Sequence, residues 1–336
     1  MLPVAHMQNN LVSIIVPLYN RAHLLPKLFA CIENQTYPHL ELVLVDDGST
    51  DAPETSIRDY PPQRRVPLQF LRQANAGPGA ARRLGLEHAQ GEYIQYLDSD
   101  DEILPDKIEK QVHALKHDPE AVMAWTTTKT VDAQGRTGIR KLSDQPSADL
   151  LATALQWRRW HTSSCLWRYP DRSKVCWLNL YNGEDVVHDV SVGVHWRHTV
   201  FLAEPLTVSF AYDDTLWTGK PSEHYRDGVT RCPEECLVLL GRAQMQHLPI
   251  YTAPLTERFY HVGCLMARVG DRPRMTSSLK NAVRLAPTWP QRMEARAAFL
   301  LLNRLWHHSN IMSRLLWRLH RRLTPYTRHV GRGIGC

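Results

Sequence analysis

The chain has 336 residues, of which 43% are hydrophobic and 22% charged. These proportions are ordinary for a globular protein, and the length suffices for one large domain or a domain with an appendage. The formal net charge is +6, but it is unevenly placed, because residues 98–101 are acidic and the last segment is rich in Arg and His.

We expect no transmembrane helix, because no apolar run is long enough, and no signal peptide, because the N-terminus lacks a charged leader before an apolar core. The seven cysteines are scattered and odd in number, which argues for reduced thiols. Cys232 and Cys236 stand one helical turn apart, but no second ligand pair follows, so zinc is not expected. We therefore expect a cytoplasmic protein.

In chain order, the first part of the sequence alternates between short apolar runs and helical patterns. Runs rich in β-branched residues predict buried strands at 11–17, 42–45, 68–71 and 93–97. Apolar residues at helical spacing predict helices around 24–32, 80–86 and 108–115, with Asn20 as a cap of the first. Strands that alternate with helices form right-handed βαβ units. We therefore expect an α/β fold with a mostly parallel sheet flanked by helices.

Polar residues directly follow three of these strands, at 19–20, 46–51 and 98–101. In a parallel sheet, ligands bind beyond the carboxyl ends of the strands. Three separate strands thus deliver amides and carboxylates to one edge, which indicates a ligand site more strongly than any one cluster does.

The third cluster consists of Asp98, Ser99, Asp100 and Asp101. Neighbouring carboxylates repel each other, and partial burial adds to the cost. Mg²⁺ or Mn²⁺ would relieve this repulsion, because these ions prefer oxygen ligands. A solvated acidic cap of the next helix is the other interpretation. On this cluster alone both stay open.

The periodicity weakens beyond residue 123. A turn at 132–136 separates two expected strands, and residues 160–168 resemble another strand. Two further short strands are expected at 200–202 and 206–210.

Residues 182–185 mark a loop that enters a helix carrying apolar residues at helical spacing. The character changes near residue 231, where helical patterns begin to dominate. We therefore expect a first domain at 1–230 and a helical C-terminal extension at 231–336. Within it, residues 260–285 resemble one pair of antiparallel helices of the tetratricopeptide kind, although a single pair is weak support for a repeat.

Five segments, 12–20, 45–51, 75–82, 96–101 and 183–185, together resemble the motifs of the family 2 inverting glycosyltransferases, in the same order. The resemblance covers roughly residues 11–210, and its N-terminal motifs are specific as a group. It implies a GT-A fold (the fold of nucleotide-diphospho-sugar transferases), a nucleotide-diphosphate sugar donor, most often a UDP-sugar, and a divalent metal, Mn²⁺ or Mg²⁺.

The resemblance also assigns roles to individual residues. Asp47 would bond the base, with Pro17 and Tyr19 lining its pocket, and Asp185 would be the general base. Glu184 would orient the acceptor or bond locally. The expected metal ligands are Asp98 and Asp100, which form a DxD motif. The expected catalytic residues are Asp185 and Glu184. The expected nucleotide-sugar site consists of Pro17, Tyr19, Asn20, Asp46, Asp47, Arg82, Asp98 and Ser99.

The chemistry of sugar transfer agrees with these residue types. A metal that bridges the oxygens of a leaving diphosphate stabilises it without a proton, and a carboxylate can deprotonate the attacking hydroxyl. A single base opposite the leaving group inverts the anomeric centre. His161 and His188 could each be a ligand or contact the acceptor, or be hydrogen-bonded structural residues.

Other functions fit less well. A sugar nucleotidyltransferase would carry a Gly-rich phosphate loop near the first strand, where this chain has Pro17 to Arg21. A dinucleotide-binding oxidoreductase is disfavoured because no Gly-x-Gly-x-x-Gly follows that strand. A non-catalytic sugar-nucleotide or glycan-binding scaffold stays open as the alternative from a different class.

The end of the chain carries apolar residues that alternate with arginines at 311–322, together with Trp306 and Trp317. Such a helix suits an anionic membrane surface, or it packs on the core with a solvated basic face. We expect a glycan or lipid-linked acceptor in bacterial surface polysaccharide synthesis and peripheral contact with the inner face of the cell membrane. Nucleic acid is not an expected partner.

Overall fold

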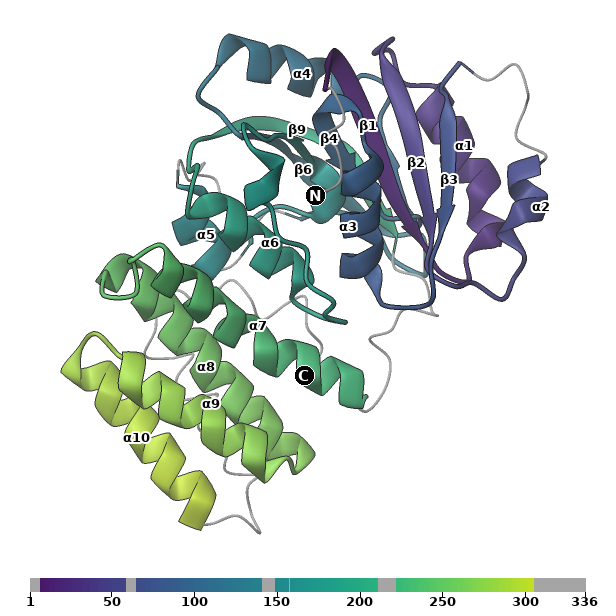
Figure 1. The fold of residues 1–336 in the computed structure, drawn as a ribbon. Helices are drawn as coiled ribbons and strands as arrows, with labels where there is room; N and C mark the ends of the chain where they lie inside the picture. The colour runs from purple at the N-terminus through teal and green to yellow at the C-terminus, as the bar shows by residue number, and fades with distance from the viewer. Residues whose placement is uncertain (1–6, 59–64, 141–148, 157, 211–221, 305–336) are drawn as a thin grey trace. The chain divides into compact units, whose positions relative to one another are not determined.

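The computed structural model describes residues 7–58, 65–140, 149–156, 158–210 and 222–304 (Figure 1). The chain divides into two compact units, residues 1–218 and 219–336. The boundary predicted after residue 230 falls within the helix α7 (Glu223–Arg242). The basic segment 311–322 lies outside the described residues, so its membrane contact stays a prediction.

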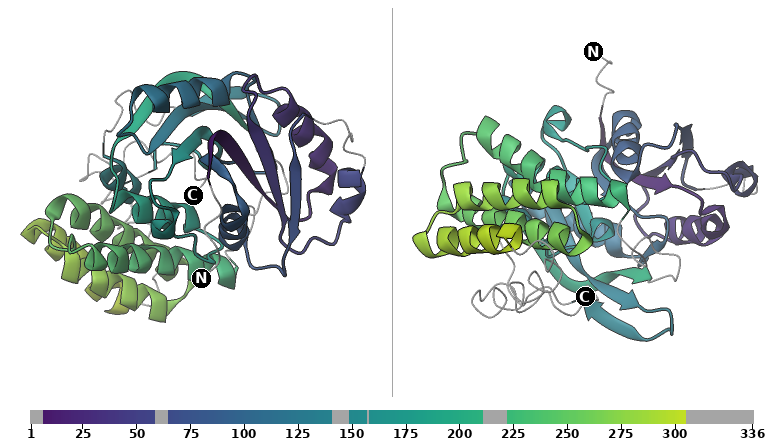
Figure 2. Two further views of the ribbon diagram at one scale, coloured as in Figure 1. Left: turned by 45° about the horizontal axis from the view of Figure 1, so that its top comes forward. Right: turned by 90° about the horizontal axis from the view of Figure 1, so that it is seen from below.

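The first unit is built on one curved sheet (Figure 2). Its described strands are β1 (Gln8–Leu18), β2 (Leu40–Asp46), β3 (Leu68–Arg72), β4 (Gly91–Tyr96), β5 (Asp101–Ile103), β6 (Met123–Val131), β7 (Thr137–Arg140), β8 (Cys165–Arg168) and β9 (Thr199–Phe210). Their order is β3-β2-β1-β4-β8-β6-β9-β5, with β7 paired to β6. The pairs among β3, β2, β1 and β4 are parallel, as the sequence predicts. Beyond β4 the sheet is mixed, because β8 runs antiparallel to both β4 and β6.

Helices cover both faces of this sheet (Figure 1). They are η1 (Ala22–Leu24), α1 (Leu25–Glu33), α2 (Pro53–Arg58), α3 (Pro78–His88), α4 (Lys107–His117), α5 (Leu150–Gln156), η2 (Thr162–Ser164), η3 (Arg172–Lys174) and α6 (Glu184–Gly193). In β1, Ile14 and Val16 pack with α1 and α4 in one buried cluster, whereas Ile15 packs with α3 and α6 in a second cluster. Since successive side chains of a strand point to opposite faces, a strand buried on both faces reads as a continuous apolar run.

Three local predictions were wrong. Residues 160–168 form a strand only from Cys165 onward, because 162–164 close a 3₁₀ turn. The two strands expected at 200–202 and 206–210 are one strand, β9, whose pairing with β6 shifts register around Pro205. Asn20 caps no helix: it adopts a positive φ of 51°, and its Oδ1 accepts a hydrogen bond from the Thr50 amide at 2.8 Å.

The second unit is helical, as predicted. Its described helices are α7, α8 (Pro249–Val269), α9 (Arg272–Leu285) and α10 (Trp289–Arg304). Pro249 begins α8, where its missing N–H costs nothing, and Asp271 caps α9 by accepting from the Arg274 amide. The helices α8 and α9 pack closely, with Gly263 against Leu279. Within the described residues, no helix combines the length and hydropathy needed to cross a membrane.

Candidate functional site

The predicted polar clusters meet at one edge of the sheet, because β2, β1 and β4 are parallel neighbours. The Asn20 amide donates to Ser49 Oγ at 2.9 Å, and Asn20 Oδ1 accepts from Thr50. The loops that follow β1 and β2 are thereby tied together. Tyr19 stays 49% exposed beside them, so its ring is accessible to a ligand.

Asp46 and Asp47 are both buried at the end of β2. Asp47 accepts from Gln73 Nε2 at 2.7 Å and from the amides of Ala76 and Gly77 at 2.8 Å each. Its carboxylate therefore shapes the loop that enters α3. A carboxylate has about four acceptor positions, so one remains for a ligand. Asp46 accepts from the Ser49 amide at 2.9 Å.

Arg82, on α3, is the central cation of the site. Its Nη2 donates to Asp98 Oδ1 at 2.6 Å and its Nη1 to Glu184 Oε1 at 3.0 Å, while its guanidinium lies 5.0 Å from the ring centroid of Trp177. Burial opposes the charge of Arg82, but the two carboxylates outweigh it and raise its pKa. Arg82 therefore stays charged between the acidic turn after β4 and the start of α6.

A close backbone approach permits this arrangement. A Cβ on Gly79 would lie 2.0 Å from the carbonyl oxygen of Leu178, so only glycine lets α3 approach the segment before Glu184.

The acidic turn contains three carboxylates in different surroundings. Burial raises the pKa of Asp98, but Arg82 and His161 outweigh it, so the net pKa is lowered. Burial and repulsion from Asp98 and Asp101 raise the pKa of Asp100 to about 6, although Arg21 opposes the shift. Arg21 Nη1 lies 3.2 Å from Asp100 Oδ2.

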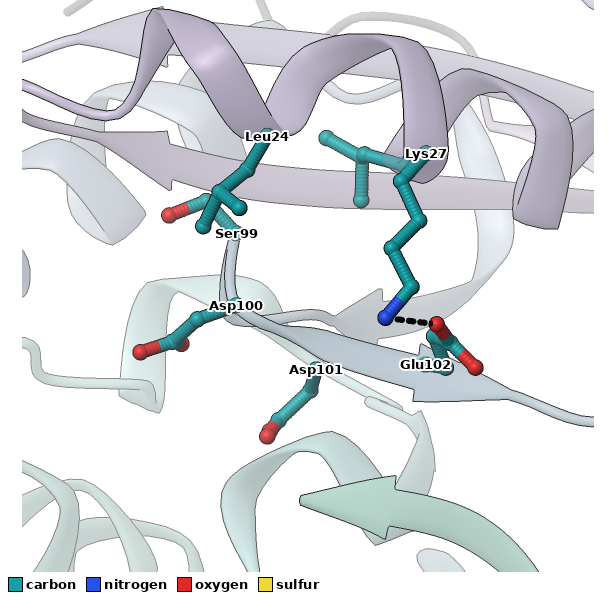
Figure 3. A pocket seen from close by; sticks show the side chains of 7 residues that line it. Leu24, Lys27, Ser99, Asp100, Asp101 and Glu102 are labelled. Atoms are coloured by element: carbon teal, nitrogen blue, oxygen red, sulfur yellow. Dashed lines mark ion pairs between the residues drawn. The ribbon is translucent and has the colours of Figure 1, made fainter. Parts of the chain in front are cut away.

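Figure 3 shows the outer side of this turn, where a small pocket is lined by Leu24, Lys27 and residues 99–102. Lys27 reaches from α1 and forms an ion pair with Glu102. Asp100 and Asp101 point away from the Lys27 ammonium. Lys27 is thus paired with Glu102 and not with Asp100 or Asp101 in the same turn.

The residues present fit a divalent cation. One ligand atom from each of Asp98, Asp101 and His161 lies within 4.8 Å of the others, and the two carboxylates are ligands of the kind that suits Mn²⁺. Asp101 Oδ2 accepts from Ser163 Oγ at 2.6 Å and lies 3.2 Å from His161 Nδ1. The structure therefore groups Asp98 with Asp101 and His161, whereas the sequence pairs it with Asp100.

Glu184 and Asp185 begin α6, after Gly183 in the left-handed conformation with a φ of 82°. Burial and the neighbouring Asp185 raise the pKa of Glu184 to about 7, although Arg82 opposes the shift. Asp185 is more accessible, with a side-chain exposure of 28%, and it forms an ion pair with Arg158. Asp185 Oδ1 accepts from the Val186 amide at 2.8 Å. Of the two carboxylates, that of Asp185 is the more exposed.

Asp189 anchors Arg158 from inside the core. It is fully buried and accepts from Arg158 Nε and, at 2.8 Å, from Trp160 Nε1. His188 is also buried, with Nδ1 2.8 Å from Asp189, Nε2 2.8 Å from the Tyr169 hydroxyl, and its ring stacked on Trp177. His188 is therefore a hydrogen-bonded structural residue, and of the two histidines only His161 adjoins the carboxylate cluster.

Sequence reasoning missed Arg158 and Trp177. Arg158 precedes another arginine in a segment without clear periodicity, and Trp177 is one of ten tryptophans. Both matter through partners far along the chain, Asp185 and Arg82, so no local pattern marks them.

Residues 13–171 match the model described as "Glycosyl transferase family 2". An uncharacterised glycosyltransferase of Haemophilus influenzae is 48% identical over 107 residues, which are 31% of this chain and 42% of the relative. The uncharacterised glycosyltransferase YibD of Escherichia coli is 29% identical over 202 residues, 58% of this chain and 56% of the relative. The putative teichuronic acid biosynthesis glycosyltransferase TuaG of Bacillus subtilis is 39% identical over 106 residues, 31% of this chain and 42% of the relative. The chain thus spans about half the length of the curated relatives it matches.

Among solved structures, S. aureus TarS (residues 1–349, in complex with UDP-GlcNAc) aligns with a TM-score of 0.66 at 20% identity. The alignment covers 93% of this chain and 92% of that TarS fragment. This likeness confirms the expected GT-A fold.

Proposed function

Because residues 13–171 match the model of glycosyl transferase family 2, we propose that the protein is an inverting glycosyltransferase. It moves a sugar from a nucleotide-diphosphate donor, a UDP-sugar in the first instance, to a hydroxyl of a glycan or lipid-linked acceptor. The observation that carries this proposal is the convergence of Arg82, Asp98 and Glu184 with the cluster of Asp101 and His161. Ligands bind beyond the carboxyl ends of the strands of a parallel sheet, and carboxylates that hold a divalent cation there would suit a nucleotide diphosphate.

In this proposal the nucleoside lies against the loops after β1 and β2. Pro17, Tyr19 and Asn20 line its pocket, and Asp47 accepts from the base through its remaining position, while Asp46 holds the loop. The TarS complex contains a uridine nucleotide sugar, which supports testing UDP first.

A divalent cation, Mn²⁺ or Mg²⁺, would be held by Asp98 with Asp101 and His161, and Asp100 is the further carboxylate that the family resemblance favours. When bound, such an ion supplies charge stabilisation to the leaving diphosphate. Arg82 keeps Asp98 ionised and in place, and Ser99 borders the same site.

Asp185 acts as the general base that takes the proton of the acceptor hydroxyl. Arg158, itself fixed by Asp189, orients the Asp185 carboxylate. Glu184 serves mainly to hold Arg82, since it is buried and bonded to it. A single base opposite the leaving group lets the acceptor hydroxyl displace the diphosphate directly, and this displacement inverts the anomeric carbon.

The setting we propose is the synthesis of a bacterial surface polysaccharide. The similarity to TuaG, a putative teichuronic acid biosynthesis glycosyltransferase, supports this. Contact with the inner face of the membrane would bring the enzyme to a lipid-linked acceptor.

Transfer assays test the proposal. The purified chain is incubated with Mn²⁺ and a panel of UDP-, GDP- and dTDP-sugars, and release of the nucleoside diphosphate is measured with and without candidate acceptors. We expect one donor to be consumed, and Asp185→Asn to abolish this without loss of donor binding. Donor binding without turnover for every acceptor would favour the non-catalytic scaffold instead.

A further inference from the structure

A lysine lies in the core of the first unit without an acidic partner. Lys107 begins α4 and is fully buried. Its Nζ donates to Gln111 Oε1 at 2.7 Å and to Gln95 Oε1, and no carboxylate in the described part of the chain forms an ion pair with it. Burial lowers its pKa to about 7. A buried lysine is costly, which raises the question of what it does there.

The ammonium determines which way two side-chain amides point. A glutamine amide has one accepting oxygen and one NH₂ group that only donates. Since Lys107 donates to both oxygens, both NH₂ groups must face the opposite way. There Gln95 Nε2 donates to the carbonyl of Ser163 at 3.0 Å, and Gln111 Nε2 donates to the carbonyl of Ser164 at 2.9 Å.

These two carbonyls belong to the turn η2, which touches the acidic cluster. Ser163 Oγ donates to Asp101 Oδ2 at 2.6 Å and accepts from the Asp98 amide at 3.1 Å. Ser164 Oγ accepts from the His161 amide at 3.1 Å. All three candidate ligands are therefore held by the turn that the two glutamines fix.

We propose that Lys107 is a positioning residue for the cation site. It orients Gln95 and Gln111, which hold η2, and η2 in turn holds Asp98, Asp101 and His161 at their spacing. The proposal rests on the proposed function, because it presumes that these three residues bind a divalent cation.

The test replaces Lys107 with methionine, which has similar length and no donor. Lys110→Met on the same helix is the matched control, since Lys110 is exposed and pairs with Asp106 and Glu204. Binding of Mn²⁺ alone is measured from the free-ion signal in electron paramagnetic resonance, and folding is followed by thermal melting.

We expect Lys107→Met to melt no lower than the wild type, because an unpaired buried cation has been removed, and yet to bind Mn²⁺ about tenfold more weakly, as for other supporting residues of metal sites. Lys110→Met should bind Mn²⁺ like the wild type. A purely structural lysine would change the melting temperature and leave Mn²⁺ affinity alone.

Unchanged Mn²⁺ affinity in folded Lys107→Met overturns the proposal. If that variant does not fold, Ser163→Ala decides instead: it removes the hydroxyl between Asp98 and Asp101, and unchanged affinity there also overturns the proposal. If the wild type binds no Mn²⁺, the metal site itself is contradicted. If the wild type and the variant bind Mn²⁺ equally well, the metal site stands and only the role of Lys107 is contradicted.

Discussion

Arg82 and Glu184 lie 102 residues apart in the chain, yet Arg82 Nη1 donates to Glu184 Oε1 across 3.0 Å. The same guanidinium holds Asp98, and only 6% of the Arg82 side chain is exposed. One buried cation thus connects the start of α6, where the proposed base lies, to the acidic turn after β4.

Replacing Arg82 with methionine should destabilise the fold. Glu184, which is buried, and Asp98, whose side chain is 24% exposed, would lose their shared partner. Breaking a buried ion pair from one side costs about 3–5 kcal/mol. Urea denaturation measures the loss. Arg82→Lys keeps the positive charge but not the forked pair of N–H donors, so it should retain only part of the stability that Arg82→Met loses. Equal stability of Arg82→Met and the wild type would show that the pair contributes nothing to the fold.

Replacing Asp185 with asparagine should remove catalysis and leave donor binding intact. Loss of a general base lowers the rate about 10²–10⁴-fold. Donor binding should stay intact because Asp185 is not part of the proposed nucleotide site. The turnover rate and the dissociation constant for UDP are measured on the same preparation. Glu184→Gln is the comparison: if it loses turnover while Asp185→Asn keeps it, Glu184 is the base.

Replacing Asp189 with asparagine should lower stability by about 3–5 kcal/mol, because Arg158 would lose the fully buried one of its two anionic partners, Asp189 and Asp185. Asp132→Asn is the matched control, since its pair with Arg136 is exposed, and such pairs contribute about 0–1 kcal/mol. Denaturation in urea compares both variants with the wild type. Equal losses of unfolding free energy in the two variants would mean that the buried pair of Asp189 contributes no more to stability than the exposed pair.

Lys107→Met should also change how stability depends on pH. The pKa of Lys107 is about 7 in the folded state, below the ordinary lysine value of 10.5, so the folded state binds fewer protons than the unfolded state between these values. Wild-type stability should therefore rise with pH across this window and fall as pH drops toward 7, by at most about 5 kcal/mol. The variant should lack this rise. Urea denaturation from about pH 6 to about pH 9 gives the free energy of unfolding of both proteins as a function of pH. Parallel curves for the variant and the wild type would contradict the lowered pKa of Lys107.

The sequence predicted the parallel half of the sheet and the edge where the site lies, because both depend on local patterns. An apolar run such as 11–17 identifies a strand buried on both faces, and polar residues directly after it fall at the strand's end. Family motifs then supplied Arg82, Asp98 and Asp185 as candidates, and the structure places Arg82 between Asp98 and Glu184.

Pairings across the fold could not be predicted. The contact of Arg158 with Asp185 and the grouping of His161 with Asp101 depend on how η2 and α6 pack, which no local spacing encodes. The sequence predicts two strands at 200–202 and 206–210, but β9 is continuous, because a register shift accommodates Pro205 within the strand.

The central claim is tested most directly by isothermal titration calorimetry of UDP, GDP and dTDP against the folded protein, with Mn²⁺ and with EDTA in its place. The account predicts that one nucleotide, UDP in the first instance, binds with Mn²⁺ and binds far more weakly in EDTA. Absence of binding by all three nucleotides in the presence of Mn²⁺ would contradict it.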